Sequence, residues 1–203
     1  MDTAFQLAVL FFSIVIHEVA HGYASLRMGD PTARDAHRIT LNPLAHIDPF
    51  GTILLPLILI WTHSPVLLGW AKPVPFNPMY FRDIRKGIMV VGAAGPAANL
   101  ILAAVSGVVV QFIGPGGSIG NLLYSACIIN VGLAVFNMIP IPPLDGSRVA
   151  FGIVPPRWLP AYMRLERFGF IIIFALLMTP ILSDWFIRPV SHVIRLIFLG
   201  PYA

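Results

Sequence analysis

Residues 17–21 read His-Glu-Val-Ala-His, the His-Glu-x-x-His pattern of zinc sites, and they lie within an apolar segment. Residues four positions apart share one face of a helix, so the imidazoles of His17 and His21 can reach the same metal ion. Glu18 lies beside them and can accept a proton from an attacking water molecule. Ionisable groups inside a membrane segment are costly and usually functional. The pattern therefore predicts metal-assisted hydrolysis at membrane depth, rather than two histidines that only hydrogen-bond within a helical core.

A catalytic zinc ion generally takes three protein ligands, so the two histidines need a partner. Asp145 is the strongest candidate, because it follows an apolar segment where an unpaired carboxylate would be costly. Nearby prolines stop a regular helix, and Gly146 permits a tight turn that could present the carboxylate. The alternative is an aspartate that caps the next helix. Three other histidines have no partner four residues away and are not expected to bind metal: His37, His46 and His63.

The composition is that of a membrane protein. Of the 203 residues, 57% are hydrophobic and 11% are charged, whereas soluble domains carry about 25% charged residues. The net charge of +4 resides in loops rather than along one helix face, which argues against nucleic-acid binding. The single cysteine, Cys127, lies in an apolar stretch and suits a small packing residue. Residues 1–203 are therefore expected to form one domain embedded in the lipid bilayer.

Five apolar segments and a short apolar tail stand out, at 4–24, 51–70, 87–113, 120–139, 168–186 and 190–199. We expect an all-α polytopic membrane protein, a bundle of about 4–6 transmembrane segments with a re-entrant or short β element near the active site. The third segment is expected to be interrupted at Gly95-Pro96, because proline removes a backbone donor and can kink a helix.

The basic residues predict the orientation in the membrane. Loops 27–38, 72–86 and 148–167 hold three, four and four of the 13 Lys and Arg residues, while the loop at 114–117 holds none. Cytoplasmic loops are rich in Lys and Arg, so the active site is expected nearer the cytoplasmic side of the cell membrane. Because segment 51–70 connects two basic loops, a re-entrant insertion is favoured there over a full span.

The stretch 137–146 reads Asn-Met-Ile-Pro-Ile-Pro-Pro-Leu-Asp-Gly. Together with the His-Glu-x-x-His pattern, it resembles the site-2 proteases, a family of intramembrane zinc metalloproteases. The stretches 29–33, 41–44 and 69–75 are similar to the compact prokaryotic branch, which carries no PDZ or CBS domain.

The resemblance implies one Zn2+ per chain, held by His17, His21 and Asp145, with Glu18 as the general base. It also draws attention to residues 95–99, which read Gly-Pro-Ala-Ala-Asn and are similar to a family segment beside the site.

Two asparagines lie in apolar surroundings, Asn99 and Asn137, and buried amides need hydrogen-bond partners. Either could bind an extended substrate backbone or donate to the oxyanion of the tetrahedral intermediate. The alternative is that they bond to neighbouring helices, a common use of asparagine within membranes.

These parts predict an intramembrane zinc endopeptidase that cuts membrane-spanning proteins. Its substrate must be locally unwound, and residues 34–48 could pair with it as a strand. One alternative is a divalent-metal transporter that uses the same four residues as a transit site, but the internal duplication typical of transporters is absent from the sequence. Another is a catalytically silent pseudoprotease that binds membrane partners.

Overall fold

A computed structural model describes residues 3–62 and 71–203. These residues form helices and turns, with no β-strand among them. Three helices are long and apolar enough to cross a membrane: α1 (Thr3–Arg27), α4 (Ile84–Ile113) and α5 (Gly117–Asn137). The protein is thus an all-α polytopic membrane protein, as predicted. Residues 34–48, expected to pair with a substrate as a strand, contain no strand; they include the end of a short helix (Thr32–Asp35) and the helical turn Pro43–His46.

Shorter helices flank the three long ones. They are α2 (Thr32–Asp35), α3 (Leu55–Trp61), α6 (Asp145–Ile153), α7 (Leu159–Arg164), α8 (Gly169–Leu177), α9 (Pro180–Leu182) and α10 (Arg188–Leu199). Tighter or wider helical turns lie at Pro43–His46, Pro49–Leu54, Pro78–Tyr80, Pro156–Trp158, Leu165–Arg167, Ser183–Ile187 and Gly200–Tyr202. The apolar segment 168–186 is divided at Pro180, because proline cannot donate the backbone hydrogen bond that would continue α8.

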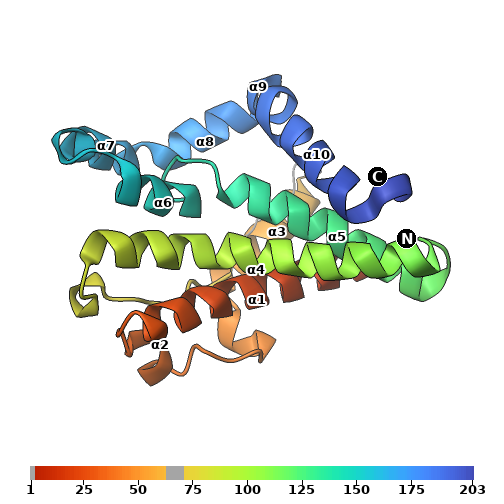
Figure 1. Cartoon of the computed structure of the whole chain (residues 1–203), viewed down its shortest axis with the longest axis horizontal. Coiled ribbons are helices and arrows are strands. Elements are labelled where there is room, and N and C mark those ends of the chain that lie inside the picture. The colour runs from red at the N-terminus through yellow and green to blue at the C-terminus, as the bar shows by residue number, and fades with distance from the viewer. Residues whose placement is uncertain (1–2, 63–70) are drawn as a thin grey trace.

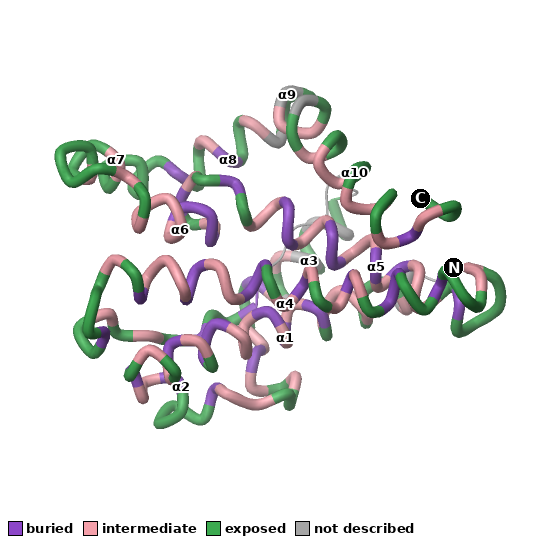
Figure 2. Tube along the Cα trace, in the orientation of Figure 1, coloured by how far each residue is buried: buried purple, intermediate pink, exposed green. Residues whose placement is uncertain are grey.

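The long helices form the centre of the molecule. In Figure 1, α4 lies between α1 and α5, with α6 packed on one end of α4 and α10 across α4 and α5. Figure 2 shows that buried positions concentrate along the facing sides of these helices. Apolar side chains from α4, α5 and α10 fill the core there: Ala103, Val110, Cys127, Val131, Val135 and Leu199.

Helix α4 is continuous, which corrects the interruption predicted at Gly95-Pro96. It runs from Ile84 to Ile113 with Pro96 inside it, because packed neighbouring helices support a helix that has lost one backbone hydrogen bond. A second glycine, Gly92, lets α6 approach: a Cβ atom there would lie 2.5 Å from Arg148 Cβ and 3.0 Å from the Asp145 carbonyl oxygen. Small residues of this kind let membrane helices pack closely.

The three basic loops meet at one end of the molecule. Figure 1 places α2, the start of α4 and the α6–α7 region at that end, and the α4–α5 turn at the opposite end. The part of segment 51–70 that the structure describes includes α3, which has 7 residues, far fewer than the ~20 needed to cross a bilayer. Residues 63–70 lie outside the described part of the chain, so the choice between re-entry and a full span stays a prediction.

Candidate metal centre

Three ligand atoms from two distant parts of the chain converge at the centre of the helix bundle. Asp145 Oδ2 lies 2.9 Å from His17 Nε2 and 3.1 Å from His21 Nε2, and the two imidazole nitrogens are 3.0 Å apart. All three side chains are buried. Among the described residues, these three are the histidine and acidic side chains whose ligand atoms lie close enough together to hold one metal ion.

The donor set fits zinc. Imidazole nitrogen and carboxylate oxygen are ordinary zinc ligands, and a tetrahedral ion holds its ligand atoms roughly 3.3–3.5 Å apart. The observed separations are only a few tenths of an ångström shorter. Gly95 keeps this space open, because a Cβ atom at that position would lie 2.5 Å from His21 Nε2 and 2.6 Å from His17 Nε2. The site is therefore a cradle that any side chain at residue 95 would fill.

Both imidazoles are oriented through their other nitrogen. His17 Nδ1 lies 2.6 Å from Asn99 Oδ1, and His21 Nδ1 lies 2.7 Å from the Val91 carbonyl oxygen. An amide or carbonyl oxygen only accepts, so each Nδ1 must carry the proton and donate it. That tautomer leaves the Nε2 lone pair of each ring directed at the candidate site, which is how metal-bound histidines are commonly held.

Asp145 is the first residue of α6, immediately after the proline-rich turn. Its Oδ1 accepts a hydrogen bond from Arg148 at 3.0 Å, which leaves Oδ2 to face the histidines. Burial alone would raise the pKa of the Asp145 carboxyl. When no metal is bound, a proton on Nε2 of His17 or His21 would donate to Oδ2, and these hydrogen bonds outweigh burial and hold that pKa well below its ordinary value. Asp145 is thus an ionised carboxylate with one oxygen available for a cation.

A buried chain of amides lies behind His17. Asn99 Nδ2 donates to Asn130 Oδ1 at 2.7 Å, and Asn130 Nδ2 donates in turn to Ser13 Oγ at 2.9 Å. Asn99 and Asn130 are essentially inaccessible to solvent. Asn99 therefore forms hydrogen bonds with neighbouring helices. This role was predicted from the sequence as the alternative to substrate binding. The role of Asn130 was not predicted from the sequence. The available signal was that a further asparagine lies on the same apolar helix, seven residues before Asn137.

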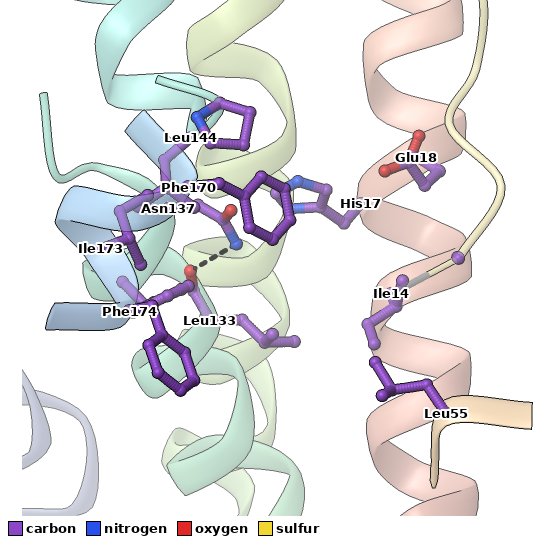
Figure 3. A pocket seen from close by; sticks show the side chains of 13 residues that line it. Ile14, His17, Glu18, Leu55, Leu133, Asn137, Leu144, Phe170, Ile173 and Phe174 are labelled. Atoms are coloured by element: carbon purple, nitrogen blue, oxygen red, sulfur yellow. Dashed lines mark hydrogen bonds between the residues drawn. The ribbon is translucent and has the colours of Figure 1, made fainter. Parts of the chain in front are cut away.

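Glu18 and Asn137 border a cavity beside the three ligands. The cavity has a volume of about 340 Å3 and is mainly apolar, with His17, Glu18 and Asn137 as its polar lining residues. Figure 3 shows it between α1 on one side and α5 and α8 on the other. Its apolar walls come from Ile14, Leu55, Ala71, Leu133, Phe136, Pro143, Leu144, Phe170, Ile173 and Phe174. Asn137 Nδ2 donates to the Leu133 carbonyl oxygen at 3.0 Å within α5.

The turn that carries Asp145 is held by Tyr162 from α7. The Tyr162 hydroxyl lies 3.0 Å from the Pro140 carbonyl oxygen and 3.2 Å from the Ser147 carbonyl oxygen. Burial raises the pKa of this hydroxyl, so it remains a proton donor at neutral pH. The contact joins the proline-rich turn to the start of α6.

Among the described residues, no further histidine joins the three ligands. His46 is fully buried and its Nε2 lies 2.9 Å from the Thr40 carbonyl oxygen. His37 is exposed in the loop after α2, and His63 is outside the described residues.

Comparison with known proteins places these features in a family. The model of peptidase family M50 matches residues 116–180. YwhC of Bacillus subtilis is 37% identical over 186 residues, which cover 87% of this chain and 81% of that protein. Rip2 of Mycolicibacterium smegmatis is 29% identical over 187 residues, or 89% of this chain and 69% of that protein. The name of each describes a zinc metalloprotease. No solved structure matches the chain significantly.

Proposed function

This chain belongs to peptidase family M50, the site-2 proteases, and on that premise we propose that it cleaves peptide bonds in the membrane-spanning segments of other proteins. It is a zinc metalloprotease and a multi-pass membrane protein. The proposal goes further by assigning the residues, the substrate class and the location of the reaction.

The observation that carries the proposal is the position of the candidate ligands. His17 and His21 lie within α1, a helix long enough to span the membrane, and the adjoining cavity is mainly apolar. A water-soluble substrate would gain little from such walls, whereas an apolar segment of a membrane protein can fill them. We assign His17, His21 and Asp145 as the zinc ligands.

We assign the proton transfers and the binding of the substrate to side chains of this protein. When bound, zinc activates water and polarises the scissile carbonyl. Glu18, which lines the cavity next to His17, takes the proton of the attacking water and passes it to the leaving amine. Asn137 lines the same cavity, and its amide is the group that we assign to the substrate backbone or the developing oxyanion.

The proposed orientation places the metal centre nearer the cytoplasm, with residues 1–203 as one membrane domain of the cell membrane. Support comes from the three basic loops, which meet at one end of the molecule.

The test compares the native protein with Glu18→Gln, in purified form, on a panel of single-span model proteins. We expect the variant to keep one zinc per chain and to lose cleavage, because Gln cannot accept the proton. Cleavage that persists in Glu18→Gln would exclude Glu18 as the base. Bound zinc with no cleavage by the native protein would exclude the proposed protease activity on such spans.

A further inference from the structure

Residues 71–77, which we call the strap, form an extended segment without helix or strand that passes beside α1. Its central residues are Lys72-Pro73-Val74-Pro75. A residue before proline is pushed into an extended conformation, and both Lys72 and Val74 precede one. Proline also lacks a backbone N–H, so Val74 carries the one N–H among residues 73–75. The sequence thus encodes an extended segment in which Val74 carries the only backbone donor among the three central residues, 73–75.

The strap is anchored on both sides of Val74. Lys72 N donates to the His46 carbonyl oxygen at 2.9 Å, and the Arg38 guanidinium donates to the Lys72 carbonyl oxygen at 2.6 Å. At the other end, Asn77 N donates to Asp30 Oδ2 at 2.7 Å. Asp30 and Arg38 are both buried, so the anchors are shielded from water. The segment is therefore held in register along α1.

Helix α1 is shaped to receive the strap next to the candidate ligands. The Val74 side chain is buried against Gly22, the residue after His21. A Cβ atom on Gly22 would lie only 2.9 Å from Val74 Cγ1, so glycine is what permits this close approach.

The donor at the centre of the strap reaches the proposed general base. Val74 N donates to Glu18 Oε2 at 2.8 Å. A hydrogen bond to one carboxylate oxygen fixes the rotation of the carboxyl group and leaves the other oxygen free. Charge-assisted bonds of this kind are among the stronger ones in proteins.

The same strap also reaches the Asp145 side of the centre. The Arg148 guanidinium carbon lies 5.1 Å from the centroid of the Phe76 ring, in a cation–π contact, while Arg148 donates to Asp145 Oδ1 at 3.0 Å. Phe76 is itself stacked on Phe81, with ring centroids 6.2 Å apart. The ring thus holds the guanidinium where it can fix the rotamer of Asp145.

We propose that the strap is a positioning element of the metal centre, in which the Val74 N–H aligns Glu18 and the Phe76 ring aligns Arg148 and, through it, Asp145. This inference rests on the proposed role of Glu18 as general base. It adds three positioning residues, Val74, Phe76 and Arg148, to those assigned above.

The first test separates the Val74 N–H from the packing of its side chain. Val74→Pro removes the donor, whereas Val74→Ala keeps the donor and removes two methyl groups. With a single-span model protein that the native enzyme cuts, we expect kcat to fall about tenfold or more in Val74→Pro, with KM and bound zinc unchanged. Val74→Ala is expected to lose less. An equal loss in both variants, or an unchanged kcat in Val74→Pro, would overturn this part.

A companion variant guards against misfolding of Val74→Pro. Pro73 and Pro75 are exposed, so replacing both with alanine leaves the buried contacts in place while adding two competing donors and flexibility. We expect kcat to fall about threefold with zinc content unchanged, since a loosened strap holds Glu18 less often. Native kcat in this double variant would overturn the proposal.

The second test measures zinc affinity rather than catalysis. We expect Phe76→Ala to weaken zinc binding about tenfold in a competition with a chelator, and Phe76→Tyr, which keeps a ring under Arg148, to restore it. Zinc binding that is native in Phe76→Ala, or equally weak in both variants, would count against the Phe76–Arg148 contact. This measurement needs no cleavage, so it still tests the strap if the native protein cuts none of the model spans and the proposed function fails.

Discussion

The Nδ1 atom of His17 lies 2.6 Å from Oδ1 of Asn99, and this contact joins α1 to α4 at the metal centre. Asn99 could in principle turn its amide nitrogen toward the ring instead. Its Nδ2 is occupied by Asn130 Oδ1 at 2.7 Å, so the oxygen must face His17. A buried amide on a neighbouring helix thereby decides which nitrogen of the histidine is free to bind a metal.

Replacing Asn99 with alanine should weaken zinc binding. The His17 ring would lose the acceptor that fixes its tautomer, and loss of such partners typically costs 10–100-fold in metal affinity. The measurement is a zinc competition with a graded chelator on purified protein. Asn99→Asp keeps an acceptor oxygen and is expected to bind zinc more tightly than Asn99→Ala. Equal zinc affinity in Asn99→Ala and the native protein would contradict the role assigned to this contact.

Asn130 should matter through Asn99 rather than by itself. In Asn130→Ala the Asn99 amide loses the partner that sets its orientation, so we expect a weaker loss of zinc affinity, about 3–10-fold. Residues in one hydrogen-bond network have non-additive effects. The double variant Asn99→Ala/Asn130→Ala should therefore bind zinc no worse than Asn99→Ala. Losses in affinity that simply multiply would show that the two asparagines act independently.

Gly95 should be intolerant of even a methyl group. A Cβ atom at this residue would lie 2.5–2.6 Å from the Nε2 atoms of His21 and His17, where the metal has to sit. We expect Gly95→Ala to lose most of its bound zinc, as measured by metal content per chain. Gly132→Ala on α5 is the matched control, because nothing lies within 4 Å of its added Cβ. A full complement of zinc in Gly95→Ala would mean that the ligands meet elsewhere.

The candidate ligands were predictable from the sequence because their signals are local. His17, Glu18 and His21 follow from helical spacing, and Asp145 follows from a proline-rich turn at the end of an apolar segment. The helical class and the three long helices follow from the length of the apolar segments.

The partners of those residues were harder to predict because they depend on which helix faces meet. Nothing local indicates that Asn99 faces His17 rather than the cavity, or that Asn130 lies behind it. The Val74–Glu18 bond is a contact between a backbone group and a side chain 56 positions away, so no pattern of residue types records it. The continuity of α4 through Pro96 likewise depends on tertiary packing, which overrides the local preference of proline.

Asn137 should behave in the opposite way to Asn99. It is part-exposed and lines the cavity beside His17 and Glu18, and its Nδ2 donates to the Leu133 carbonyl oxygen of its own helix. If its amide stabilises the oxyanion, Asn137→Ala should lower kcat by about 10²–10³-fold while zinc content stays native. Asn121 on the same helix is exposed at the opposite end, and Asn121→Ala serves as the control, with native kcat expected. Zinc loss in Asn137→Ala, or an undiminished kcat, would show that its amide serves the fold and not the reaction.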